Sequence, residues 1–272
     1  MTKVRAHLRR TPIGVAIVAG FFVLGLIGPW IAPYDPLAID LLHEYESPSW
    51  THLLGTGDNG IDILSALLHG ARLAAIVGIV VVGVSVVLGT LLGTWAGYAG
   101  RFADHIITGV ADLVQAFPAI VLNIAVLALV ARPGLVHLIV ALAVNGWVLY
   151  ARLARAETLS LREREFVEAA RALGVPTHEV LRRHVIPNLL GPLVIQATTG
   201  LGVVILAEST LSFLGLGPGK AVSWGALLDQ GTSVLLRFPH VALFSGGAIA
   251  LTVLGFNLTG DWLRDRLDPR LR

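Results

Sequence analysis

The chain has 272 residues, of which 55% are hydrophobic and only 14% are charged. Soluble domains carry about a quarter of charged residues, and a chain this short cannot bury so much apolar surface in one water-soluble core. The composition therefore excludes an ordinary soluble domain and indicates a protein of the lipid bilayer. The net charge of +2 argues against a nucleic-acid partner, and the absence of cysteine excludes disulfides.

The N-terminus starts with a basic arm, residues 1–11, and continues into an apolar stretch over residues 12–32. A secretory signal peptide has a similar outline, but its apolar region is shorter and ends at a small-residue cleavage site. This stretch is longer and lacks such a site before Pro33. We therefore interpret it as a retained first membrane-spanning helix.

Six segments are apolar over about the 20 residues that a helix needs to cross a bilayer. They are residues 12–32, 72–97, 112–131, 135–153, 189–211 and 241–260. The expected fold is an all-α membrane protein with six transmembrane helices. Its expected layout is an extracytoplasmic segment at 33–71, a five-helix core over 72–264 and a cytoplasmic tail at 265–272.

The distribution of basic residues predicts the orientation of the chain. Most of the twenty Lys and Arg residues fall in the N-terminal arm, in the segment 154–188 and in the C-terminal tail. The segment 34–70 has six acidic residues and no Lys or Arg. Because loops rich in Lys and Arg stay on the cytoplasmic side, we expect both termini and the segment 154–188 in the cytoplasm.

Two patterns inside the spans concern helix packing. A small residue recurs at every fourth position of the second span, at Ser85, Gly89, Gly93 and Gly97. Such a ridge lets another helix approach closely, and that helix belongs either to the same chain or to another subunit. In the third span, Pro118 removes a helical hydrogen bond and is expected to kink the helix.

The cytoplasmic segment carries the most informative pattern. Apolar residues recur with helical spacing at Phe166, Ala169, Ala170 and Leu173. We expect an amphipathic helix that ends at Gly174 in a left-handed conformation. Pro176 and Thr177 predict the start of a second short helix, which Pro187 should stop before the fifth span. A solvated connector would expose the apolar stripe to water at a cost, so we interpret this segment as a docking surface.

This segment resembles the EAA loop of binding-protein-dependent ABC importer permeases. The family pattern is Glu-Ala-Ala, three residues, Gly, nine residues and a hydrophobic-x-hydrophobic-Pro ending. The matching residues are Glu168, Ala169, Ala170, Gly174, Ile186 and Pro187. The departures are His184, where the pattern has an aliphatic residue, and Ile186, where it has Leu.

The resemblance extends over nearly the whole chain and is closest to the dipeptide and oligopeptide branch. The stretches similar to that branch are Arg183–Asn188, Gly55–Ser65 with Gly70–Arg72, Ala116–Pro118, and Glu208–Gly217 with Ser223–Gly225. Gly57 and Ile61 depart from its usual sequence. The similarity points to the second, C-type permease subunit of such an importer.

The resemblance implies a type I importer permease fold in the bacterial inner membrane and a non-catalytic subunit that forms half of a path for di- or oligopeptides. The implied partners are a homologous B-type permease, one or two cytoplasmic ABC ATPase subunits and an extracytoplasmic peptide-binding protein. The implied ATPase-coupling residues are Glu168, Ala169, Ala170, Arg171, Gly174 and Pro187. The short helix would dock in a cleft of the ATPase as a lever. Alternatively, Glu168 is an ordinary solvated charge helped by Arg171.

No cofactor or metal site is expected in this chain. Gly215–Lys220 resembles a phosphate loop, but Leu214 stands where that motif needs glycine and Ala221 replaces its Ser or Thr. The nine histidines show no metal-ligand spacing. We therefore expect ATP and Mg²⁺ to be bound by the partner ATPase subunits.

Candidates for the translocation path or an outer gate are Glu208, Gln196, Asn123 and Phe213. A carboxylate near the end of a span is costly against lipid, so Glu208 either lines the path or caps the outer loop. The rival function is a stand-alone secondary transporter or channel. That class uses charged relays within the spans and paired broken helices, whereas this chain has few intramembrane charges and a docking loop.

Overall fold

The structure is a computed structural model that describes the backbone of residues 2–219 and 221–267, and the side chains from residue 13 onward within these ranges. This part of the chain contains helices and no strand, as expected. The helices are α1 Thr2–Ile31, α2 Ile63–Ala99, α3 Arg101–Gln115, α4 Ala119–Ala128, α5 Leu135–Leu161, α6 Glu165–Ala172, α7 Thr177–Val180, α8 Ile186–Phe213, α9 Trp224–Ser233 and α10 Pro239–Leu267, with short turns η1 Leu41–His43, η2 Asp58–Gly60 and η3 Leu181–Val185.

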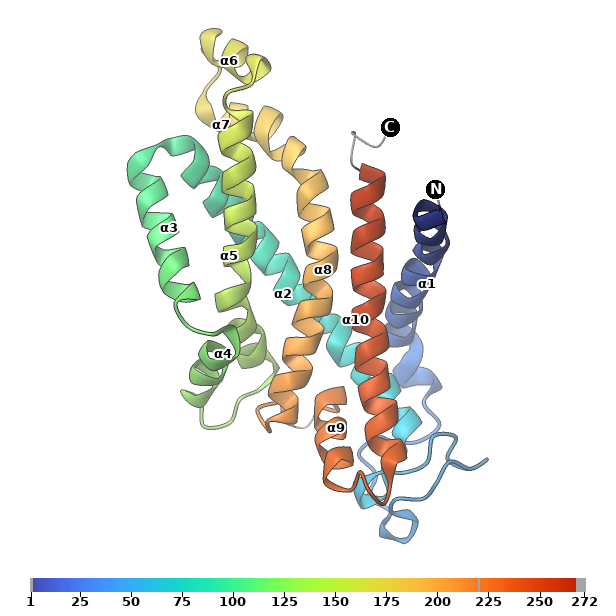
Figure 1. Cartoon of the computed structure of the whole chain (residues 1–272). Coiled ribbons are helices and arrows are strands. Elements are labelled where there is room, and N and C mark those ends of the chain that lie inside the picture. Colours follow the sequence, from blue (N-terminus) through green and yellow to red (C-terminus); the bar gives the residue numbers. More distant parts are fainter. Residues whose placement is uncertain (1, 220, 268–272) are drawn as a thin grey trace.

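The long helices form one bundle, and α2 crosses it obliquely (Figure 1). The start of α1, the end of α10 and the helix α6 lie at one end of this bundle, which we name the loop end. The helix α9 and the segment between α1 and α2 lie at the opposite end, the α9 end. The start of α1 and the end of α10 thus share one side of the bundle with the segment that is expected to dock.

Five helical stretches are long and apolar enough to cross a membrane, and α3 with α4 makes a sixth if this bent pair is one span. The predicted third span, 112–131, is wrong as a single helix: α3 and α4 meet at an angle of 85° around residues 116–118. Pro118 has an extended conformation, which does not fit a helix. A proline also disfavours the helical conformation of the residue before it, and both effects end α3 before Pro118. The predicted kink is therefore confirmed, and it is a break.

Helix α2 begins at Ile63, well before the predicted residue 72. Its start is fixed by Asp62, whose carboxylate accepts hydrogen bonds from the backbone N–H of Ser65 at 2.8 Å and from its hydroxyl at 2.7 Å. This capping satisfies backbone donors that a helix start leaves free. Residues 63–71, the last part of the predicted 33–71 segment, therefore form the first part of α2.

The small-residue ridge of α2 packs against α5 of the same chain. A β-carbon added at Gly89 would lie 2.5 Å from the carbonyl oxygen of Trp147, and one at Gly97 would lie 2.9 Å from that of Arg155. At Gly93 an added β-carbon would overlap the backbone of Ala151. The two backbones therefore approach as closely as glycine permits, which resolves the open question of the ridge in favour of contact within the chain.

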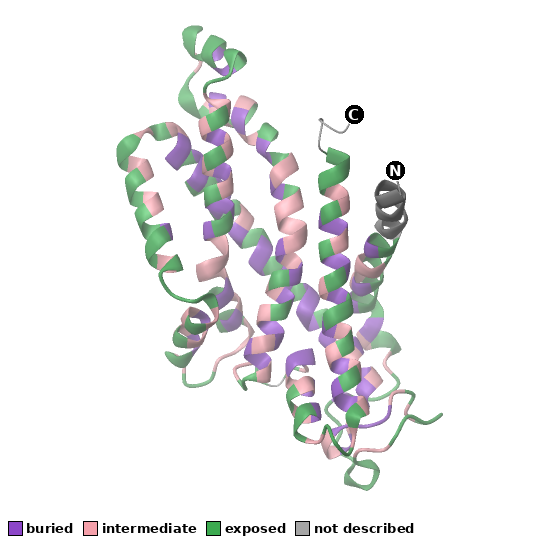
Figure 2. Cartoon of the chain, in the orientation of Figure 1, coloured by how far each residue is buried: buried purple, intermediate pink, exposed green. Residues whose placement is uncertain are grey.

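Apolar clusters join the remaining helices. Toward the α9 end, Phe21 packs edge-to-face against Trp224 and Phe256, with ring centroids 5.9 Å and 5.7 Å apart. A second cluster joins α4 to α2 and α5 through Leu127, Val77 and Leu138. Buried residues follow the inward faces of the helices, and exposed residues cover much of the outward faces (Figure 2). Apolar outward faces suit a bundle surrounded by lipid.

Candidate functional site

The loop after α5 is a compact unit that ends α6 in a Schellman motif. Gly174 has φ +79°. Its N–H donates to the carbonyl of Arg171 at 3.0 Å, and the N–H of Val175 donates to that of Ala170 at 3.1 Å. A left-handed residue at this position favours glycine, because other side chains are strained there. The predicted glycine elbow is confirmed.

The inner face of this loop is anchored on the bundle. Val167, Ala170 and Val180 are buried together, and Tyr98 at the end of α2 packs against them with Val175. Ala170 was expected in the outward stripe of α6 but faces inward, because it shares a helix face with Val167 three residues earlier. The small side chain thus allows close packing inside the loop.

The outer face of α6 is uncovered in this chain. The side chain of Phe166 is 45% exposed and that of Leu173 is 84% exposed. Glu168, Ala169 and Arg171 are exposed on the same short helix. No ion pair joins Glu168 to Arg171 in the part of the chain that the structure describes. This face combines apolar contact area with a carboxylate and a guanidinium that have no mutual bridge.

Pro187 does not stop a helix, so the prediction of two separate helices before the fifth span is wrong in its second half. Helical structure continues from Thr177 to Phe213 through a wide π-helical turn, Leu181–Val185. In this turn the N–H of Ile186 donates to the carbonyl of Leu181, five residues back. Proline lacks an N–H and its ring crowds the preceding turn, and a wide turn relieves both conflicts. The loop is therefore continuous with the spanning helix α8.

At the α9 end, Glu208 forms a buried joint between α8 and α9. Its carboxylate accepts hydrogen bonds from the hydroxyls of Ser212 at 2.8 Å, Ser223 at 2.9 Å and Ser209 at 3.3 Å. The side chain is almost fully buried. Ser223 is the N-cap of α9 and also accepts from the N–H of Gly225 at 3.1 Å. Of the two open roles for Glu208, this geometry favours capping of the outer segment over lining a path.

The helix α9 was missed by the sequence reasoning, although Ser223 before an apolar run is a signal for a helix start. Its position is fixed by Trp224, whose Nε1 donates to the carbonyl of Leu67 at 2.8 Å. Gly225 lies so close to Ser209 of α8 that any β-carbon would overlap the backbone there. The α9 end is therefore a closely packed region.

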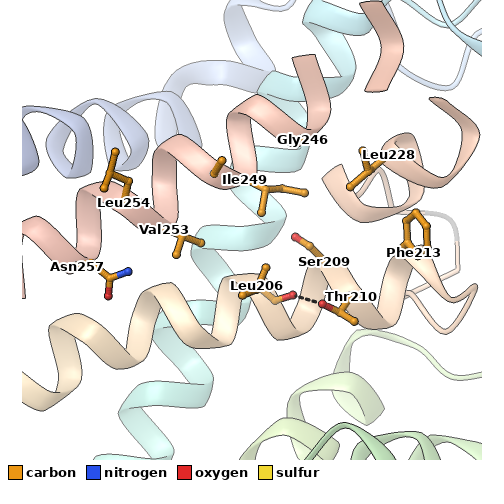
Figure 3. A pocket seen from close by; sticks show the side chains of 11 residues that line it. Leu206, Ser209, Thr210, Phe213, Leu228, Gly246, Ile249, Val253, Leu254 and Asn257 are labelled. Carbon is orange, nitrogen blue, oxygen red and sulfur yellow. Dashed lines mark hydrogen bonds between the residues drawn. The ribbon is translucent and has the colours of Figure 1, made fainter. Parts of the chain in front are cut away.

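A groove of about 540 Å³ lies between α8 and α10 and is bounded by α9 (Figure 3). Its wall is mostly apolar, and it includes Phe213, Thr210 and Asn257. The other predicted path residues do not line it: Glu208 is buried, Asn123 is buried on α4, and Gln196 is half-buried nearer the loop end of α8. The four candidates for the path thus do not form one site.

Sequence reasoning also missed two ion pairs between α3 and α5. Arg155 pairs with Asp104 through two nitrogens of its guanidinium: Nε donates to Oδ1, and Nη2 donates to Oδ2 at 2.7 Å. Arg152 pairs with Asp112 at 2.7 Å. The two acids lie about two turns apart on α3, and this spacing does not identify their partners on α5.

The fold and the loop together define a multi-pass helical membrane protein with a compact amphipathic loop at one end of its bundle. Residues 89–272 match the family described as binding-protein-dependent transport system inner membrane component, and the chain belongs to this family. It is therefore a permease component of an ABC transporter, which works with other subunits of such a transporter.

Relatives share nearly the whole length of the chain. It is 37% identical over 261 residues to a dipeptide transport system permease protein of Alkalihalophilus pseudofirmus, with 96% of this chain and 86% of that protein covered. It is 41% identical over 267 residues to a glutathione transport system permease protein of Pectobacterium atrosepticum, with 95% and 88% covered. The solved inward-facing MetNI methionine ABC transporter has the same permease fold, with a TM-score of 0.59, 17% identity, and 76% and 96% of the two chains covered.

Proposed function

We propose that this chain is the C-type permease subunit of a bacterial ATP-driven importer and forms half of the translocation path for di- or oligopeptides. Its partners are a homologous B-type permease, one or two cytoplasmic ABC ATPase subunits that bind ATP and Mg²⁺, and an extracytoplasmic peptide-binding protein. The observation that carries this proposal is the α6 loop, a rigid unit anchored to the bundle and apolar on its free face.

The α6 loop supports mechanical coupling to an ATPase. Phe166 and Leu173 offer an apolar contact surface, and burying such area drives the association of proteins. Glu168 and Arg171 add charges beside it that can pair with a partner. Because Val167 and Val180 fix the inner face, a push on α6 is passed to α2 and α8 instead of being absorbed in a flexible loop.

Peptide cargo is supported by the similar proteins. The relatives at 34–41% identity include permeases named for dipeptide, glutathione and oligopeptide transport. Glutathione is itself a small peptide, so these names share one class of cargo. The groove beside Phe213 is a candidate part of the path, completed by the B-type subunit.

The test is co-expression of this chain with its B-type permease, ATPase and binding-protein partners, followed by purification on a tag carried by this chain. We expect a stable complex, peptide on the binding protein by mass spectrometry, and ATP hydrolysis that rises with loaded binding protein. The chain alone should show no ATP turnover above a detergent blank. Uptake by the chain alone in proteoliposomes, driven by an ion gradient, would support the secondary transporter instead.

The orientation is tested with single cysteines, because the chain contains no native cysteine. A cysteine at Ser160, at the end of α5 beside the α6 loop, should react only with reagents on the cytoplasmic side. A cysteine at Ser47, exposed at the α9 end, should react only from outside. The reverse pattern would leave α6 out of reach of a cytoplasmic ATPase and contradict the proposal.

A further inference from the structure

The helix α3 is only lightly packed on the bundle. Ala111 is its one buried residue. On the opposite face, Phe102 is 81% exposed and Leu113 is 66% exposed, and most of α3 is drawn as exposed or intermediate in Figure 2. The narrow inward face consists largely of small or polar residues, so apolar contact contributes little to holding α3 in place.

Two ion pairs provide the lateral attachment of α3 to α5. Arg155 grips Asp104 with Nε and Nη2, and the two side chains are 33% and 26% exposed. The pair of Arg152 and Asp112 is more open, at 50% and 69% exposed. Ion pairs with this degree of solvent exposure are weak and are screened by salt, so they can open without a large cost. The two-pronged Arg155–Asp104 pair is the stronger of the two.

Both ends of α3 are breaks in the backbone. At its start, Gly100 has φ +96°, a conformation that glycine adopts readily and other residues rarely adopt. At its end, residues 116–118 turn the chain by 85° into α4. In contrast, α4 buries Asn123 and Leu127 and packs against α2 and α5. The helix α3 is therefore a straight rod between two joints, next to a helix that is fixed.

The α5 helix connects this rod to the α6 loop. It ends at Leu161, only a few residues before α6 begins at Glu165. Between them, Arg162 donates from Nη1 to the carbonyl of Gly97 at 3.1 Å and so ties the base of the loop to α2. A displacement of the loop therefore acts on α5 and α2 within about two turns of Arg155.

We propose that the Arg155–Asp104 and Arg152–Asp112 pairs form a releasable electrostatic lock that holds α3 against α5 in this conformation and opens when the ATPases displace the α6 loop. This inference rests on the proposed function, because it needs a partner that drives the loop. Asp104 and Arg155 are positioning residues: they contact no cargo and set the equilibrium between a locked and a released position of α3. The joints at Gly100 and Pro118 absorb the change in backbone angles.

The lock is tested by measuring the distance between α3 and α5 in the complete reconstituted complex. Spin labels are attached to cysteines at Ile106, exposed on α3, and at Ser160, exposed on α5, in a chain that has no other cysteine. We expect one short distance without nucleotide and a second, longer distance when ATP is trapped. Asp104→Asn should raise the population of the longer distance without nucleotide about three- to fivefold.

Charge swapping and salt separate a lock from simple packing. The double variant Asp104→Arg with Arg155→Asp should restore the short distance, although each single change alone favours the longer one. High salt should shift the wild type toward the longer distance, as Asp104→Asn does. It should leave unchanged a variant in which neutral residues replace both Asp104 and Arg155. Arg101→Gln is the matched control, because it removes a charge from the same helix and breaks neither pair. It should behave as the wild type.

One outcome overturns the lock without touching the proposed function. If the complex hydrolyses ATP and imports peptide while the label distance stays the same in every state and variant, α3 is fixed and the pairs are ordinary surface contacts. An equal shift from Arg101→Gln and Asp104→Asn also contradicts it, since the effect would then follow from losing any charged side chain at the start of α3 and not from breaking the pair. Pull-down of the partners by each variant confirms assembly before any distance is compared.

Discussion

Helix α5 has two neighbours that are attached to it by opposite means. Against α2 it packs backbone to backbone, with Gly89, Gly93 and Gly97 leaving no space for a side chain. Against α3 it is joined mainly by two ion pairs that are partly or fully open to solvent. Close packing is intolerant of displacement because every contact is lost together, whereas a partly hydrated ion pair can open and re-form. The α2–α5 pair is therefore the frame of the molecule, and α3 is a part that can move on it.

The α6 loop belongs to the frame by the same reasoning. Its inner face is anchored by Val167, Ala170 and Val180, and its base is tied to α2 by Arg162. Its free face carries the proposed docking surface. A lever requires this combination, since a loosely attached loop would bend when a partner pushes it.

The largest effect is expected from breaking the frame. Gly93→Leu places a side chain into the backbone of Ala151, where even a β-carbon has no space. Overpacking of a close-packed site costs about 1–3 kcal/mol, and more where backbone must shift. We expect a lower melting temperature of the purified complex and poor recovery from the membrane.

The matched control is Gly83→Leu, on the same helix but exposed, with no atom near its added β-carbon. It should melt close to the wild type. Equal loss in both variants would mean that leucine on α2 is harmful in general and that the close contact with α5 is not the cause.

A smaller effect is expected at the joint between α8 and α9. Glu208→Ala leaves the buried hydroxyls of Ser212 and Ser223 without their acceptor, at a cost of about 1–3 kcal/mol. Glu208→Gln retains an acceptor oxygen and should cost less. Hydrogen exchange over α9 should increase strongly in the alanine variant and slightly in the glutamine variant. Unchanged exchange in both would show that Trp224 and Gly225 fix α9 without the carboxylate.

The smallest effect concerns a charge-held contact at the α9 end. The pKa of His43 is raised, because Asp40 accepts a hydrogen bond from its Nδ1 at 2.8 Å and attracts its positive charge, and the pKa of Asp40 is lowered by the same partner. The contact therefore persists between the lowered pKa of Asp40 and the raised pKa of His43. The contact is lost as the pH rises through the pKa of His43 or falls through the pKa of Asp40. An NMR titration of labelled His43 should move to lower pH in Asp40→Asn, and an unchanged midpoint would contradict this pairing.

The sequence predicted the frame better than the parts that depend on distant contacts. Gly174 follows local rules of helix endings, so the end of α6 was predicted correctly, whereas Ala170 of the predicted stripe faces inward. The π-helical turn before Pro187 was not predicted. It requires α7 and α8 to be continuous, whereas the local pattern indicated two separate helices. Pro118 was predicted to kink one helix, and it separates two. The size of this bend was not predicted, because it depends on how α4 packs on other helices.

The ion pairs of α3 and the joint at Glu208 could not be derived from one-dimensional spacing. Asp104 and Arg155 are 51 positions apart, and no local rule of spacing pairs residues at such a separation. Glu208 was recognised as costly in a span, but its acceptor role depends on Ser223 being brought back by the turn before α9. Local patterns identify such residues as unusual, and only the fold supplies their partners.

The central claim, that α6 is the lever, is tested most directly at Gly174. No atom lies near a β-carbon added there, so Gly174→Val acts through its left-handed backbone alone, with about 1–2 kcal/mol of strain. Asn tolerates this conformation better, and Gly174→Asn is the matched control. We measure peptide uptake and substrate-stimulated ATP hydrolysis by the reconstituted complex, together with pull-down of the ATPase. We expect that Gly174→Val inserts and assembles but loses uptake, while Gly174→Asn retains most of it. Full uptake by Gly174→Val would contradict the lever.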